Sequence, residues 1–186
     1  MLRPLPVRSH VLGVPMRRLP MLLGLALSIS LPAVAGPLRD SVLAALDGVE
    51  DPPSRESLAP LGEGVAAELL EIARNPSVPP SRRGRAVTAL GWFPDDAVHD
   101  ALVAWLSSDD RLLARKAAGA LATGWGDRAV EDLRTALQSD DLQLRVAVVK
   151  ALASIDSDAA RAVLEARLAT ETDPTVKDGI RTALGR

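Results

Sequence analysis

Apolar residues recur at helical spacing through most of the chain. Residues 37–46 place Leu38, Val42 and Leu46 on one helix face, and a shorter helix is expected over 54–61, ended by Gly62. From there on, apolar stripes with three- and four-residue spacing alternate with short polar stretches that contain Gly, Pro and Asp. The pattern therefore predicts helices joined by short turns.

One pattern returns about every 31 residues. Leu90, Leu121 and Leu152 are 31 residues apart, and Leu184 follows after 32. Such a fixed period is typical of stacked supersecondary units, in which neighbours bury the apolar face that one unit alone cannot cover. We therefore expect Leu90, Leu121 and Leu152 in a shared core. The predicted organisation is a degenerate N-terminal capping hairpin at 36–62, followed within 63–186 by repeats at 63–92, 95–123, 127–154 and 157–185.

Two segments resemble the second helix of a HEAT-like repeat. They are residues 141–153, Asp-Leu-Gln-Leu-Arg-Val-Ala-Val-Val-Lys-Ala-Leu-Ala, and the similar run at 173–185. The resemblance implies an all-α fold, namely a right-handed α-solenoid of about five stacked helical hairpins whose second helices form the concave layer. It is specific for the fold and nearly silent on activity. Ala114 departs from it, because the family usually has Arg at that position.

The amino terminus has the three parts of a secretory signal peptide. Arg17 and Arg18 precede the apolar run 19–31, and the small residues Ala33 and Ala35 follow. We expect cleavage between Ala35 and Gly36, which gives a periplasmic or secreted, bacterial protein without a stable membrane span. An uncleaved membrane anchor is the alternative, and Met16 is a second candidate start of translation.

Composition narrows the function classes. The chain has 22 basic and 24 acidic residues, and residues 1–35 hold four arginines and no acid, so the cleaved chain would carry a net charge of about −6. That charge argues against nucleic-acid binding. Cysteine is absent, which excludes thiolate metal sites and a thiol nucleophile. His99 is the one histidine beyond residue 35, and the Asp pairs precede predicted helices, where N-capping accounts for them. We expect no enzyme, no metal and no cofactor.

Charge divides unequally between the two sets of helices. The predicted second helices contain 11 basic residues and one acid, Asp178, whereas the first helices lean acidic. Part of the basic set can pair with Asp residues of neighbouring turns, and we expect this of Arg83 and Arg145. The residues predicted to face a partner are Arg82, Arg85, Arg111, Arg115, Lys116, Lys150 and Arg181. Trp92 and Trp125, which each follow a Gly, are either interface anchors or covers over the ends of the core.

These patterns indicate a non-enzymatic scaffold or adaptor that is exported across the inner membrane and binds an acidic protein segment. Two alternatives remain. One is a lyase-like or accessory HEAT protein that acts on a cofactor-bearing protein. The other is a structural solenoid that self-associates through its last helix, where Val176, Ile180 and Leu184 would lack a following repeat. The oligomeric state is left open.

Overall fold

A computed structural model describes residues 36–48 and 53–185. The predicted signal peptide, residues 1–35, lies outside the described residues, and the predicted cleavage site lies directly before Gly36, the first of them. All regular elements in the described ranges are helical. They are α1 (Pro37–Asp47), α2 (Arg55–Leu58), the 3-10 turn η1 (Ala59–Leu61), α3 (Val65–Arg74), α4 (Pro80–Leu90), α5 (Asp96–Leu106), α6 (Arg111–Trp125), the 3-10 turn η2 (Gly126–Ala129), α7 (Val130–Ala136), α8 (Leu142–Ala153), α9 (Asp158–Thr170) and α10 (Pro174–Ala183).

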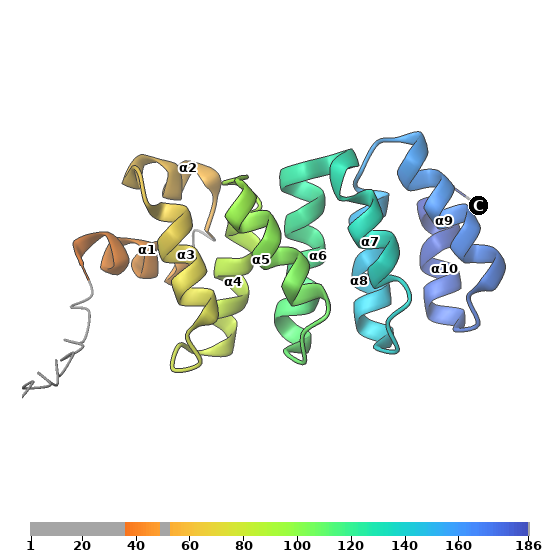
Figure 1. Cartoon of the computed structure of the whole chain (residues 1–186), viewed down its shortest axis with the longest axis horizontal. Coiled ribbons are helices and arrows are strands. Elements are labelled where there is room, and N and C mark those ends of the chain that lie inside the picture. The colour runs from red at the N-terminus through yellow and green to blue at the C-terminus, as the bar shows by residue number, and fades with distance from the viewer. Residues whose placement is uncertain (1–35, 49–52, 186) are drawn as a thin grey trace, which may run out of the picture. The chain divides into compact units, whose positions relative to one another are not determined.

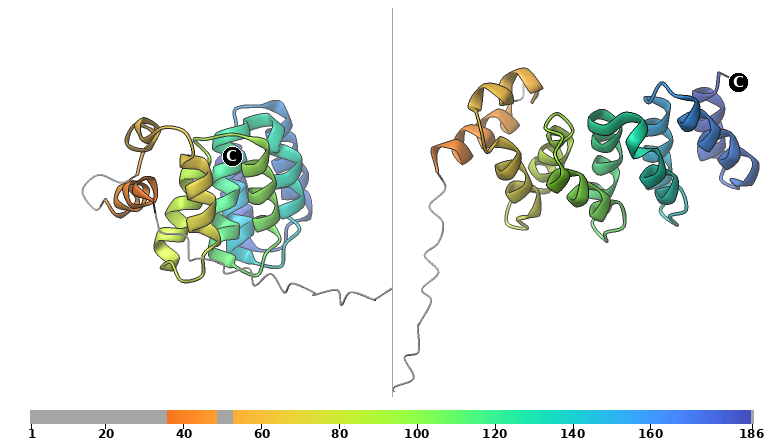
Figure 2. Two further views of the ribbon diagram at one scale, coloured as in Figure 1. Left: turned by 60° about the vertical axis from the view of Figure 1, so that its left-hand side comes forward. Right: turned by 45° about the horizontal axis from the view of Figure 1, so that its top comes forward.

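Helices α3 to α10 form four consecutive hairpins that stand side by side (Figure 1). The second helices, α4, α6, α8 and α10, pack against one another along the row and form what we call the second-helix layer. The first helices, α3, α5, α7 and α9, cover one side of that layer and touch each other less. The predicted α-solenoid is therefore confirmed. Figure 2 shows α1 and α2 at the α3 end of the row, where α1 contacts both α3 and α4.

Asp and Ser side chains begin most of the hairpin helices. Asp110 caps α6 by accepting a hydrogen bond from the Leu113 amide, and Asp141 and Asp173 do the same for α8 and α10. In the first-helix layer the caps are Asp95 and Ser157. Asp95 and Ser157 lie one residue before Asp96 and Asp158, respectively, and these two acids are two repeat periods apart.

The shared core consists of Ala, Leu and Val. Leu90, Leu121 and Leu152 are completely buried, with an exposed fraction of 0%, as the periodicity predicts. The core continues without interruption from Val42 and Leu46 in α1 to Ile180 in α10. The N-terminal residues 37–61 thus cover the first hairpin.

Two glycines allow α4 and α6 to approach closely at their carboxyl ends. A Cβ atom on Gly124 would lie 2.9 Å from the Gly91 carbonyl oxygen, and one on Gly91 would lie 2.8 Å from the Ala120 carbonyl oxygen. Backbone atoms cannot move aside as a flexible side chain can. In contrast, a Cβ on Gly119, in the middle of α6, would meet no atom within 4 Å.

The same substitution at two positions of α6 should therefore have opposite effects. Gly124→Ala should lower the free energy of unfolding by about 1–3 kcal/mol, because the added methyl group overpacks the contact with α4. Gly119→Ala should raise it by about 0.5–1 kcal/mol, because alanine loses less conformational entropy in a helix. Urea denaturation of both variants measures this, and equal effects at the two positions would contradict the packing argument.

Candidate functional site

Arginines near the start of the second helices join consecutive hairpins. The Arg83 guanidinium on α4 donates to the Ala73 carbonyl at the end of α3 and, at 2.9 Å, to the Asp110 carboxylate before α6. Arg145 on α8 occupies the equivalent position and donates to the Ser139 carbonyl and, at 3.2 Å, to Glu171. Internal pairing is confirmed for both arginines, but only Arg83 pairs with the expected Asp, whereas the acid bound by Arg145 is a Glu.

The equivalent joint at α6 is built differently. Ala114 stands where α4 and α8 have arginine, and it is buried. Arg111, one turn earlier, lies 3.7 Å from Asp141 before α8. Its side chain remains about three-quarters exposed, so this ion pair is weak. Arg111 is thus partly used within the chain, in contrast to the prediction that it faces a partner.

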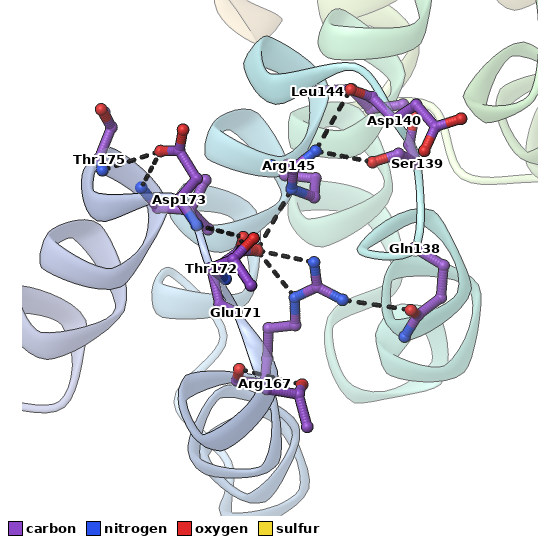
Figure 3. Close-up of polar contacts among 12 residues, drawn as sticks. Gln138, Ser139, Asp140, Leu144, Arg145, Arg167, Glu171, Thr172, Asp173 and Thr175 are labelled. Carbon is purple, nitrogen blue, oxygen red and sulfur yellow. Dashed lines mark hydrogen bonds and ion pairs between the residues drawn. The ribbon is translucent and has the colours of Figure 1, made fainter.

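Glu171 is a buried carboxylate that joins three helices (Figure 3). Its side chain is only 1% exposed, and one oxygen accepts hydrogen bonds from Arg145 on α8 and from Arg167 on α9, the latter at 2.7 Å. The other oxygen accepts from the backbone N–H groups of Thr172 and Asp173, each at 2.9 Å, directly before α10. No sequence pattern singled out Glu171. It lies in the turn between the end of α9 at Thr170 and the cap of α10 at Asp173.

The environment of Glu171 stabilises its charged form. Burial alone would raise the pKa of the carboxyl group. The hydrogen bonds from the Asp173 amide, the Arg167 guanidinium and the Thr172 amide outweigh burial and lower the pKa to about 2. Glu171 is therefore ionised at neutral pH, and its interactions are structural.

Arg82 and Arg85 on α4 bind the carboxyl end of α1. The Arg82 guanidinium donates two hydrogen bonds to the Asp47 carboxylate, at 2.7 and 2.5 Å, and Arg85 donates at 2.6 Å to the Leu46 carbonyl. Positive groups are favourable at this end of a helix, where carbonyl groups lack partners. Both residues thus hold α1 on the row of hairpins, which differs from the prediction that they are available to a partner.

Arg181 on α10 also has an internal partner, Asp178, one turn earlier at 2.8 Å. Three residues of the predicted set remain. Arg115 and Lys116 on α6 and Lys150 on α8 make no ion pair or hydrogen bond through their side chains within residues 36–48 and 53–185. Lys116 and Lys150 are exposed and Arg115 is half-buried. The structure thus reduces the predicted basic surface to these three cations on two neighbouring helices.

The two tryptophans have different surroundings. Trp125 is 9% exposed and packs against the His99 ring, with ring centroids 5.2 Å apart. Because α6 continues through Gly124 to Trp125, this side chain belongs to the core and is not an interface anchor. Trp92 follows α4 and is half-buried against the core. Of the two, Trp92 retains the larger exposed fraction.

The large aliphatic residues of α10, the last helix of the row, are buried. Val176 and Ile180 are fully buried and Leu184 is 7% exposed, because they pack onto the layer formed by α8 and α9. Exposed residues of α10 are mainly polar or small, such as Thr175, Asp178 and Thr182. Self-association through an exposed apolar stripe of this helix is therefore contradicted.

No group of His, Cys, Asp and Glu in the described part of the chain is arranged to hold a metal ion. His99 instead bridges hairpins, with its Nε2 atom 3.3 Å from the Asp132 carboxylate of α7. None of the helices in 36–48 and 53–185 has the length and apolar content needed to cross a bilayer.

Neutralising Glu171 should destabilise the protein in a pH-dependent manner. Because the folded-state pKa, about 2, lies below the ordinary value of 4.5, the carboxylate contributes stability above about pH 5 and loses it as the pH falls from 4.5 towards 2. Glu171→Gln should lower the free energy of unfolding by about 3 kcal/mol at pH 7, and the difference from wild type should shrink over that acid range.

Urea denaturation at a series of pH values measures this effect. The matched control is Glu131→Gln, because Glu131 makes an exposed pair with Arg134 one turn away. The control should cost less than about 0.5 kcal/mol at every pH. A difference between Glu171→Gln and wild type that does not change with pH would contradict the role of the ionised carboxylate.

Comparison with known proteins agrees with this architecture. No curated protein matches the sequence. The family model for HEAT repeats matches residues 100–185, which include most of α5 and all helices from α6 to α10. Repeats of this family generally mediate protein–protein interaction and typically serve as non-enzymatic scaffolds. Residues 100–185 therefore consist of HEAT repeats.

Proposed function

We propose that this protein is an exported, non-enzymatic adaptor that holds an acidic segment of a partner protein on its second-helix layer. The observation that carries the proposal is the group of three cations, Arg115, Lys116 and Lys150, whose charges have no partner in the described residues. The other arginines on this layer for which contacts are described bind acids or carbonyl groups of the chain itself. Lys177 of α10, which was not in the predicted set, also lacks a side-chain partner within residues 36–48 and 53–185, and the three cations are the unpaired ones of the neighbouring helices α6 and α8.

The chemistry of these cations favours carboxylates. Arginine binds carboxylate in a bidentate manner and lysine contributes a mobile point charge, so a segment with two or three acidic residues matches the group. The complementary charge would chiefly raise the association rate and the specificity, since exposed ion pairs add little affinity each. Binding should therefore weaken with salt.

Charge reversal tests the proposal. The triple variant Arg115→Glu, Lys116→Glu, Lys150→Glu should lose the partner proteins that wild type captures from a cell-envelope extract. It should also bind a fluorescein-labelled hexaglutamate peptide at least tenfold more weakly, because attraction becomes repulsion. Quantitative mass spectrometry and fluorescence anisotropy measure the two effects.

The control carries the same change in net charge outside the layer. Arg55→Glu, Arg128→Glu, Arg161→Glu changes exposed residues of α2, η2 and α9 and should leave capture and peptide binding unchanged. Equal behaviour of the two triple variants would refute a localised acidic-segment site.

Export is a separate part of the proposal and rests on the signal-like sequence of residues 1–35. Helix α1 begins at Pro37, so cleavage after Ala35 would leave the contacts of Val42, Leu46 and Asp47 in place. Amino-terminal sequencing of the protein isolated from its native host should therefore begin at Gly36. A sequence that begins at Met1 or Met16 would contradict cleavage.

A further inference from the structure

An apolar groove lies beside the unpaired cations, between α8 and α10. It has a volume of about 260 Å³, and its floor includes Val146 and Val149 of α8 and Val176 of α10. Lys150, the cation on α8, also lines it. The groove is smaller than the pockets of about 300–1,000 Å³ that hold small molecules and cofactors, so its size suits a single side chain.

The 31-residue period explains why the groove is open here. Val146 occupies the position that Arg115 has in α6, and Gly179 occupies the position of Arg85 in α4 and Lys116 in α6. Each earlier contact between second helices has one long basic side chain at these two positions, Lys116 together with Gly84 and Arg115 together with Ala147, whereas the α8–α10 contact has none. The groove therefore has no long side chain across it, and its deepest residues, Val149 and Val176, are 3% and 0% exposed.

Packing does not require the glycine. Gly179 lies in the interior of α10 without a positive φ, and a Cβ atom there would be 3.6 Å from Val149 Cγ1, which is an ordinary contact. Glycine in a helix interior costs about 1 kcal/mol relative to alanine. Gly179, like Gly119, is therefore not required by packing, and it leaves the space beside Val149 open.

We propose that the α8–α10 groove binds one aliphatic side chain of an extended acidic segment, whose carboxylates contact Lys150 and, on α6, Lys116 and Arg115. This inference rests on the proposed function and specifies the partner: an acidic stretch with one aliphatic residue. The aliphatic side chain supplies burial of apolar area, which the exposed ion pairs cannot supply.

The test uses the purified full chain and three fluorescein-labelled peptides of ten residues. The first has alternating Glu and Ser with one central Leu, the second replaces the Leu by Ser, and the third keeps the Leu and replaces every Glu by Gln. Wild type should bind the first peptide at least about tenfold more tightly than the second in fluorescence anisotropy, since burial of a leucine side chain contributes that much. It should bind the third more weakly than the first.

Gly179→Leu should fill the groove. We expect it to remove the tenfold advantage of the leucine peptide over the serine peptide and to leave binding of the serine peptide unchanged. Its thermal midpoint should be no lower than that of wild type, because the helix gains a better helix former. Gly179→Ala, which adds only the Cβ, provides a second variant with a smaller effect should the leucine disturb folding. The matched control, Ala104→Leu, adds leucine at an exposed position of α5 and should preserve the advantage.

The outcomes separate the two proposals. Equal binding of the leucine and serine peptides by wild type overturns the groove inference and leaves the acidic-segment function in place. Equal binding of the Glu and Gln peptides overturns the acidic-segment function, while a tenfold leucine effect would still support the groove. A leucine advantage that survives Gly179→Leu places the aliphatic contact elsewhere and overturns the inference. Failure to bind any of the peptides overturns both proposals.

Discussion

The structure depends on the burial of one aliphatic seam that consecutive second helices share. A single hairpin of α5 and α6 leaves Leu121 without cover on one side, and the neighbouring hairpins supply it. Because the core contains so little aromatic volume, the helices must approach closely. At the α4–α6 contact this requires Gly91 and Gly124, where any side chain would collide with backbone. The seam thus decides which positions face inward and leaves one strip of each second helix exposed.

The same geometry determines which charges remain free. At α4 and α8, the first turn of the second helix lies next to an acid in the turn within the following hairpin, and the arginine there is drawn into the joint, as Arg83 and Arg145 are. At the amino-terminal end, Arg82 and Arg85 are occupied by α1. The 11-to-1 excess of basic residues therefore overstates the charge available to a partner. What remains among the described residues is Arg115, Lys116 and Lys150 in the middle of the row, and Lys177 on α10.

Periodicity in the sequence was sufficient to predict the fold and the buried leucines, because repeat units impose the same environment at the same interval. It also predicted that Arg83 and Arg145 pair internally. It could not predict the partners of Arg82 and Arg85. Those partners, Asp47 and the Leu46 carbonyl, lie on α1, which has no equivalent in the repeats. For Trp125 the sequence left two interpretations open, an interface anchor or a cover over the core. Its burial supports the cover, because Gly124 allows close contact with Gly91 and α6 continues to Trp125. Glu171 was missed because its hydrogen bonds join three helices that no local pattern connects.

Departures from the repeat are consequently the most informative positions of this chain. Gly124 departs for packing, since α4 leaves no room for a side chain, whereas Gly179 has room for one and still lacks it. Packing explains the first glycine, whereas the second, like Gly119, has no packing reason. With Val146 where α6 has Arg115, and Gly179 where α6 has Lys116, the α8–α10 contact is an apolar groove next to Lys150. A segment that lies across α6, α8 and α10 would therefore contact cations at one end and the apolar groove at the other. The second-helix layer would thus favour one orientation of the bound segment.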